Sequence, residues 1–388
     1  MVFIMFNLSE ENLIEMKAVH TSKEIYQQPE VWKGFVESLS IVKDELRGFV
    51  QSIYAKHGQV RVIFTGAGTS AFAGDTLVPI LKDQHKEKVL FEAIATTDIV
   101  SNPDQYLFED APTILVSFAR SGNSPESMAA VKLGEQIVND FYQVNITCNK
   151  DGQLAQNSKN DEKSLVILTP EEAHDQGFAM TSSYTSMMIA AYILFAKEEF
   201  DSNVTINAGS LVERITDTID HVLDFDFDRI VYLGSGSLGQ LAHEAALKML
   251  ELTAGKVVAV HESSLGFRHG PKSILTDKSV VTLFMSSNPY TRKYDLDILR
   301  ELVADGKVKV VALTESRDEE VEKIANWTIT VNETGNKFTN DFSLALLYII
   351  FAQVLSLKKS IQLGITPDNP SPDGLVNRVV KGVTIYEK

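Results

Sequence analysis

The stretch VIFTGAGTS, residues 62–70, is a short run of strand-forming residues that ends in a turn of small residues before a helical pattern. The stretch IVYLGSGS, residues 230–237, repeats it, and Gly66 and Gly234 lie 168 residues apart. A repeated unit decides the architecture of a chain. We therefore predict two copies of one strand-turn-helix unit.

The strands that follow keep the spacing of the repeat. Residues 113–117 lead to Arg120-Ser-Gly-Asn-Ser124 and residues 280–284 lead to Ser286-Ser-Asn-Pro-Tyr290, with Ser121 and Ser286 aligned 165 residues apart. Later strands are expected at residues 143–148, 165–169, 308–314 and 327–331, and closing helices at 183–195 and 343–357. Apolar strands without polar alternation, separated by helices, indicate parallel sheets covered on both faces. The predicted fold class is α/β, with two tandem doubly wound parallel sheets and an N-terminal helical arm.

The length of 388 residues agrees with two domains and an extension. We predict a helical arm at residues 1–50, a first domain at 51–210 and a second domain with a C-terminal tail at 211–388. A linker is expected near residues 201–210.

The composition and net charge limit the classes of molecule that the protein is expected to bind. The formal net charge of −16 disfavours nucleic acid and anionic membranes. Cys148 is the only cysteine, so no disulfide can form within the chain, and it reads as a core residue. MVFIMF at the start is too short for a signal-peptide core. We predict a cytoplasmic protein whose partner is a small molecule.

The turn after residues 113–117 has the features of a phosphate site. Pro125 fits the first turn of a helix, so the backbone amides, the helix N-terminus, Ser121, Gly122, Asn123 and Ser124 are expected to converge on one anion, with help from Arg120. Gly68, Thr69 and Ser70 would lie at the same sheet edge. The alternative is a simple helix cap, because Ser and Asn favour that position anyway.

A second alternative is a dinucleotide site. Gly234-Ser-Gly-Ser-Leu-Gly239 matches the G-x-G-x-x-G fingerprint, and Glu262 ends the next apolar strand. The first copy of the repeat lacks the third glycine in register. The shared feature is therefore a strand-turn-helix, and we predict no cofactor.

The repeated turns, together with LKMLELT at residues 247–253 and SLGFRHGPK at residues 264–272, resemble the SIS (sugar isomerase) family. The likeness extends from about residue 50 to the end. It is strongest to galactosamine-6-phosphate deaminases, also described as tagatose-6-phosphate ketose/aldose isomerases, and includes the isomerase half of glucosamine-6-phosphate synthase.

The resemblance implies roles for single residues. Glu251 matches the base that moves a proton between C1 and C2, His269 matches a ring-opening histidine supplied by a neighbouring subunit, and Lys381 matches a lysine that can form an imine. Thr181 completes the predicted substrate-binding residues. Two departures stand out. Ala119 replaces a serine of the family's phosphate turn, and the chain lacks the synthase's glutaminase domain, which favours the ammonia-releasing direction.

Each of these residues also has a plainer interpretation. Glu251 could be a solvated helix residue, although Leu247, Leu250 and Ala254 suggest that it borders a buried stripe. His269 and Lys381 could be ordinary surface residues. No paired His or Cys spacing suggests a metal, so we predict metal-independent chemistry.

The predicted function is deamination of galactosamine 6-phosphate, or of a close hexosamine 6-phosphate, to tagatose 6-phosphate and ammonia. Ring opening and C2-to-C1 proton transfer would precede hydrolysis. The alternatives are ketose/aldose isomerisation of a hexose 6-phosphate and a non-catalytic sugar-phosphate sensor. If His269 serves a neighbouring subunit, as the resemblance implies, the protein is at least a homodimer.

Overall fold

The structure, a computed structural model, describes residues 4–85, 88–378 and 382–388. Its internal contacts divide the chain into two compact units. The first-sheet unit consists of Val31–Asp175, Ser182–Phe200 and the described part of Gly374–Lys388. The second-sheet unit consists of the described residues up to Glu30, with Gln176–Thr181 and Asp201–Asp373.

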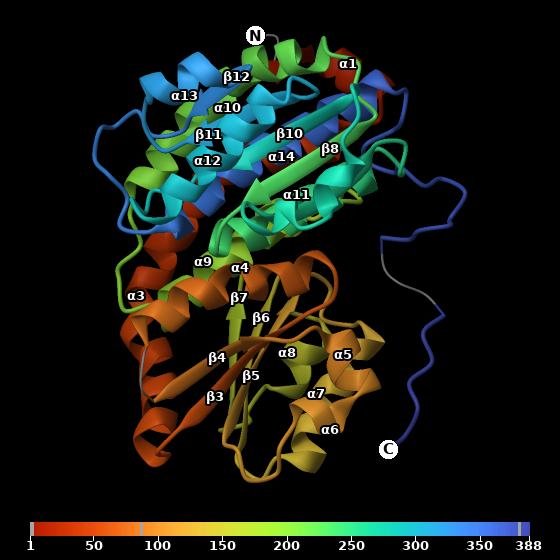
Figure 1. The fold of residues 1–388 in the computed structure, drawn as a ribbon. Coiled ribbons are helices and arrows are strands. Elements are labelled where there is room, and N and C mark those ends of the chain that lie inside the picture. Colours follow the sequence, from red (N-terminus) through yellow and green to blue (C-terminus); the bar gives the residue numbers. More distant parts are fainter. Residues whose placement is uncertain (1–3, 86–87, 379–381) are drawn as a thin grey trace. The chain divides into compact units, whose positions relative to one another are not determined.

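The first-sheet unit contains a five-stranded parallel sheet with the order β4-β3-β5-β6-β7 (Figure 1). Its strands are β3 (Val60–Thr65), β4 (Val89–Ala93), β5 (Thr113–Ala119), β6 (Phe141–Thr147) and β7 (Ser164–Leu168). β3, β5 and β6 are buried along their whole length. Such strands need cover on both faces, which explains their continuous apolar sequence.

Helices supply that cover. The helices of this unit are α3 (Gln28–Lys56), which begins in the other unit, α4 (Thr69–Gln84), α5 (Thr96–Ser101), α6 (Pro103–Tyr106), α7 (Pro125–Ile137), α8 (Gln153–Asn157), the 3₁₀ turn η1 (Glu171–Ala173) and α9 (Ser182–Phe195). Consecutive residues of β3 face opposite layers. Ile63 packs with apolar residues of α5, α7 and α8, whereas the ring of Phe64 contacts that of Phe195 on α9.

The second-sheet unit repeats the arrangement, with the strand order β12-β11-β10-β8-β9. Its strands are β8 (Arg229–Gly234), β9 (Val258–Ser263), β10 (Ser279–Phe284), β11 (Lys309–Thr314) and β12 (Trp327–Thr330), all parallel. In both sheets the first strand in the chain lies between the second and the third. The predicted α/β class with two tandem doubly wound parallel sheets is confirmed.

Strand pairing fixes how the two halves correspond. Arg61 pairs with Thr113, and Arg229 pairs with Ser279. Because Arg61 and Arg229 are equivalent, Thr113 corresponds to Ser279, and Ser121 therefore corresponds to Ser287. The alignment of Ser121 with Ser286 was one residue out of register.

The remaining helices belong to the second-sheet unit. They are α1 (Glu10–Glu15), α2 (Val19–Tyr26), α10 (Asn203–Leu223), α11 (Ser237–Leu252), the 3₁₀ turns η2 (Gly266–Arg268) and η3 (Pro271–Ile274), α12 (Thr291–Ala304), α13 (Glu319–Ile324) and α14 (Asp341–Gln362). α11 packs against α14. α12 lies against the sheet through Ile298, Leu299 and Leu302.

The N-terminal arm is helical as predicted, and it also contains a hairpin of β1 (Ile4–Met5) and β2 (Leu8–Ser9). Each compact unit is built from several segments of the sequence. The domains predicted above are single continuous segments, and their limits stay a prediction. The expected linker at residues 201–210 was wrong. Most of it forms the first turns of α10, where Val204 and Ala208 are buried.

α14 is long and apolar enough to cross a membrane, but 89% of its most apolar window is buried inside the protein. Core helices of globular proteins pass the same test of length and composition. In this chain the burial is explained by contacts with α10 and α11.

Candidate active site

The turn between β3 and α4 is shaped by two glycines. A Cβ on Gly66 would lie 2.6 Å from the backbone of Ser70, so the chain can close this turn only with glycine there. Gly68 has φ 56° and ψ −131°, a conformation that side-chain-bearing residues rarely adopt. The turn places Thr69 and Ser70, both buried, at the start of α4.

The turn between β5 and α7 lies beside it. β5 pairs directly with β3, with Thr65 opposite Ser117, so the carboxyl ends of the two strands are neighbours. Gly122 has φ 66°, and a Cβ there would lie 3.3 Å from Oγ1 of Thr147. Ser124 caps α7, because its Oγ accepts a hydrogen bond from the amide of Ser127 at 3.2 Å. The simple capping interpretation is therefore correct for Ser124, and it is compatible with anion binding at the same helix end.

A third turn, which follows β6, forms hydrogen bonds with the turn that contains Ser121. Nδ2 of Asn149 donates to the carbonyl oxygen of Ser121 at 2.9 Å, and the amide of Gln153 donates to Oδ1 of Asn123 at 2.9 Å. A Cβ on Gly152 would lie 2.6 Å from the same carbonyl oxygen. Sequence reasoning missed these supporting residues, although NKDG directly after a predicted strand was a usable turn signal.

Arg120 joins the phosphate turn to the C-terminal tail. Its Nη2 donates to the carbonyl oxygen of Arg378 at 2.9 Å, and Arg378 in turn donates to the carbonyl of Asp175. Lys381 lies outside the described residues. Thr181 is fully buried and belongs to the second-sheet unit. The substrate-binding roles of Arg120 and Thr181 and the imine role of Lys381 stay predictions.

The corresponding turns of the second sheet are filled by carboxylates. Asp295 is fully buried and accepts hydrogen bonds from Oγ of Ser235 at 2.9 Å, Oγ of Ser264 at 2.6 Å and the amide of Ser286 at 2.9 Å. Asp341 accepts from Oγ of Ser287 at 2.8 Å and from the amide of the same residue at 3.0 Å. Burial raises the pKa of Asp295, while its hydrogen bonds oppose that rise.

The carboxylates at these turns also argue against the alternative of a dinucleotide site. Gly234 and Gly236 reproduce the geometry of Gly66 and Gly68, with φ 57° and ψ −125° at Gly236. The glycines are thus required by the turn itself. Ser235 within the fingerprint already donates its hydroxyl to the buried Asp295, so this hydroxyl is not available to a pyrophosphate.

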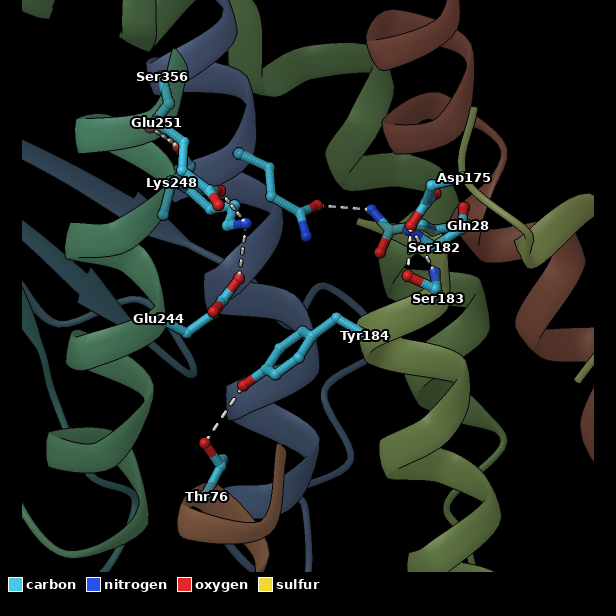
Figure 2. Close-up of polar contacts among 12 residues, drawn as sticks. Gln28, Thr76, Asp175, Ser182, Ser183, Tyr184, Glu244, Lys248, Glu251 and Ser356 are labelled. Atoms are coloured by element: carbon cyan, nitrogen blue, oxygen red, sulfur yellow. Dashed lines mark hydrogen bonds and ion pairs between the residues drawn. The ribbon is translucent and has the colours of Figure 1, made fainter. Parts of the chain in front are cut away.

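Glu251 is held by a buried lysine that the sequence reading did not single out. Nζ of Lys248 lies 2.5 Å from Oε2 of Glu251 and 3.3 Å from Oε1 of Glu244, all on α11 (Figure 2). The side chains of Lys248 and Glu244 are fully buried, whereas that of Glu251 is 23% exposed. Burial lowers the pKa of Lys248, but the two carboxylates raise it further, and the net direction is upward. A lysine that stays charged can thus fix one carboxylate that still reaches solvent.

The apolar stripe predicted beside Glu251 was wrong in detail. Leu250 is exposed, and the buried face of α11 instead contains Leu241, Ala245, Met249 and Leu252 together with the two charged residues Glu244 and Lys248. The signal that could have found them is the spacing Glu-x-x-x-Lys-x-x-Glu, which places the three groups on one side of a helix.

His269 lies in the same unit as Glu251, exposed between η2 and η3. Gly270 follows with φ 121°, which makes a sharp turn after the histidine. Among the residues that the structure describes, no hydrogen bond or ion pair joins His269 to Glu251. The ring-opening role of His269 and its contribution to a neighbouring subunit, which the resemblance implies, stay predictions.

Cys148 is buried, and burial raises the pKa of its thiol to about 12, which keeps it protonated and unreactive. Within the described parts of the chain, no group of three or more His, Cys, Asp or Glu side chains is arranged to hold a metal ion.

Comparison with known proteins finds a protein family that matches both halves of the chain. The SIS domain family matches residues 56–197 and 225–358, so each match includes one of the two sheets. The chain belongs to the SIS domain family. The two matched segments contain the turns of the first sheet, Glu251 and His269.

Relatives of this SIS chain carry more specific names. It is 44% identical to the D-galactosamine-6-phosphate deaminase AgaS of Shewanella sp. (strain ANA-3), over 98% of this chain and 95% of that protein. It is 42% identical to the protein of the same name from Escherichia coli, over 94% and 95%. A solved structure of the tagatose-6-phosphate ketose/aldose isomerase from Escherichia coli superposes with a TM-score of 0.86 at 39% identity, over 95% of this chain and 96% of that one.

Proposed function

We propose that this SIS protein is an enzyme that converts galactosamine 6-phosphate and water to tagatose 6-phosphate and ammonia. Two relatives that share more than two fifths of its residues over nearly its whole length carry the name D-galactosamine-6-phosphate deaminase. The observation that carries the proposal is the ion-paired group on α11, which holds Glu251 partly exposed beside a buried, charged lysine.

The phosphate of the sugar binds at the two turns of the first sheet. These turns present backbone amides, hydroxyls and the N-terminus of α7 at adjacent strand ends. A helix of 13 residues carries a positive end suited to an anion. Local donors of this kind overcome the unfavourable long-range field of a chain with a net charge of −16.

Ring opening comes first, because only the open chain exposes the aldehyde at C1 and an acidic hydrogen at C2. His269 takes the proton of the anomeric hydroxyl and returns it to the ring oxygen, because an imidazole can both accept and donate a proton. The resemblance to the family implies that this histidine serves the site of a neighbouring subunit. We therefore propose a homodimer or larger homo-oligomer.

Glu251 then moves the proton. Its carboxylate removes the hydrogen from C2, the resulting enolamine carries a hydroxyl on C1, and the same group returns a proton to C1. The product of this step has a C2 imine and a CH₂OH group at C1. Lys248 fixes the orientation of the carboxylate through a charge-assisted hydrogen bond to Oε2.

Hydrolysis completes the reaction. Water adds to the C2 imine, the carbon–nitrogen bond breaks, and ammonia leaves as the C2 ketone forms. We further propose that the enzyme works in the cytoplasm and that its partners are small sugar phosphates, not nucleic acid or membranes. An acidic surface supports this choice because it repels other polyanions.

The test is an ammonia assay of the purified chain with galactosamine 6-phosphate and, in parallel, glucosamine 6-phosphate, which differ only at C4. Release of ammonia with formation of tagatose 6-phosphate from the first substrate is the expected result. Binding of both substrates without ammonia would contradict the proposal and favour a sensor.

A second candidate is ketose/aldose isomerisation of a hexose 6-phosphate, which the name of the solved Escherichia coli structure favours. That reaction needs the same base and no imine hydrolysis. Incubation with tagatose 6-phosphate in D₂O separates the two, because an isomerase forms an aldose phosphate without any amine donor.

A further inference from the structure

One carboxylate forms ion pairs with two cations in the loop that carries His269, one on each side of the histidine in the sequence. Oε2 of Glu301, on α12, lies 2.5 Å from Nε of Arg268, and its other oxygen pairs with Nζ of Lys272. Arg268 directly precedes His269, and Lys272 follows it by three residues. The two cations that flank the histidine therefore share a single anchor.

Further contacts limit the movement of this loop. Phe267 is fully buried and packs in the same apolar cluster as Ile298, Leu299 and Leu302 of α12. The amide of His269 donates to the carbonyl oxygen of Gly266 at 2.8 Å. His269 itself is exposed, so an imidazole open to solvent is carried by a backbone that α12 holds through apolar and charged contacts.

The small free energy expected from these ion pairs argues against stabilisation of the fold as the main role of Glu301. The side chains of Arg268, Lys272 and Glu301 are 26%, 27% and 34% exposed. Ion pairs with this much water access contribute little to folding, about 0 to 1 kcal/mol each. Hydrogen bonds from Lys272 and Arg268 lower the pKa of Glu301, so it remains ionised through the neutral range.

We infer that Glu301 is a positioning residue for His269, which it holds at the angle needed for ring opening. This inference rests on the proposed function. Effective proton transfer needs the imidazole within hydrogen-bond reach of the anomeric oxygen, and a misplacement of about 1 Å can cost 10²-fold in rate. The anchor matters whichever subunit the histidine serves.

The chain offers two matched controls. Asp297 lies one turn earlier on α12 and pairs with Arg300, not with Arg268 or Lys272 of the loop, and both side chains of that pair are at least 50% exposed. Asp305 pairs with Lys272 at 2.5 Å but leaves the contact between Arg268 and Glu301 intact. D297N should therefore change nothing, and D305N should have a smaller effect than E301Q.

The experiment compares E301Q, H269N, the double variant and D297N by steady-state deamination of galactosamine 6-phosphate. We also measure inhibition by galactitol 6-phosphate, an acyclic probe that needs no ring opening. E301Q should lower kcat about 30-fold, leave the inhibition constant of galactitol 6-phosphate within twofold of wild type, and add nothing to the loss caused by H269N. If E301Q is poorly folded, R268Q serves in its place, because it removes one of the two contacts and leaves Lys272 anchored.

The outcomes separate the two proposals. Wild-type kcat in E301Q beside a clear loss in H269N would overturn the positioning role and leave the proposed function standing. Multiplying losses in the double variant would also overturn it, because Glu301 would then act independently of His269. Full activity in H269N would instead contradict the ring-opening step of the proposed function.

Discussion

The turn after β5 and the turn after β10 occupy equivalent places in the two sheets, yet they are chemically opposite. The first presents Ser121, Asn123 and backbone amides at a helix N-terminus. In the second, the hydroxyls and amides are bound to the buried Asp295 and to Asp341. The comparison teaches that one copy of the repeat keeps the donors of the proposed anion site at its turn, while the other satisfies the equivalent donors with its own side chains.

The second-sheet unit is also distinguished by the helix that follows its first strand. α11, which follows β8, carries Glu251 together with the buried Lys248, and the two form an ion pair. The two copies of the repeat therefore differ chemically, with hydroxyls and a helix N-terminus at the turns of the first sheet and an ion-paired carboxylate on α11 of the second unit.

The 168-residue offset of the repeat aligns Thr76, Ile80 and Asp83 of α4, the equivalent helix of the first unit, with Glu244, Lys248 and Glu251 of α11. The apolar Ile80 stands in place of the central lysine. Residue 80 therefore cannot form the ion pairs that Lys248 forms with Glu244 and Glu251.

The largest expected effect comes from removing the base of the second unit. E251Q keeps the size of the side chain but cannot accept a proton, so kcat should fall roughly 10³-fold while the substrate still binds. Exchange of the C2 hydrogen with solvent, followed by NMR in D₂O, should stop as well. Exchange at the wild-type rate would remove Glu251 from its assigned role.

The next effect tests the open turn. S121D adds to the first sheet the kind of charge that the second sheet already contains, and its repulsion of a phosphate should raise KM for galactosamine 6-phosphate about 100-fold. Steady-state kinetics at constant ionic strength measures this. An unchanged KM would mean that the phosphate binds elsewhere.

A smaller effect compares equivalent serines. S287A removes a hydroxyl that donates to Asp341 and should lower the free energy of unfolding by about 2 kcal/mol without changing KM. S121A should do the reverse, with a raised KM and a free energy of unfolding within about 0.5 kcal/mol of wild type. Urea unfolding and kinetics on both variants check the pair. Identical behaviour would erase the distinction between the turns.

The smallest effect is a difference in pH dependence at equivalent positions on α4 and α11. Burial, with a contribution from Asp98, raises the pKa of Asp75 to about 6. Burial, with a contribution from His261, lowers the pKa of His243 to about 4. Asp75 therefore costs stability as pH rises from about 4 to 6, whereas His243 costs stability as pH falls from about 6.5 to 4.

Urea unfolding across pH 4 to 7 measures both slopes. D75N should remove the first and H243Q the second, so the two variants should change the slope of stability against pH in opposite directions. Slopes that change in the same direction would contradict the assignment.

Much of the fold was predictable because continuous apolar strands have few alternatives to a covered parallel sheet. β4 was not predicted, since VLFEA is short and carries a charge. The turns at Gly66 and Gly122 were predictable because strand ends and helix starts have local signals. The ion-paired group on α11 was not, because charged residues in a helix read as solvated until tertiary packing shows them buried.

The carboxylates that fill the second sheet's turns lay beyond sequence reasoning for another reason. Asp295 and Asp341 reach Ser286 and Ser287 from α12 and α14, up to 55 residues along the chain. No local pattern reports such a contact. The repeat alone suggested two similar turns, and only their partners show that they differ.

The most direct test of the account is a calorimetric titration of the E251Q variant with galactosamine 6-phosphate. The account predicts one binding site per chain, lost when S121D is added and retained when S287A is added. Two sites per chain, or one site that survives S121D, would contradict the claim that the first sheet alone holds the phosphate.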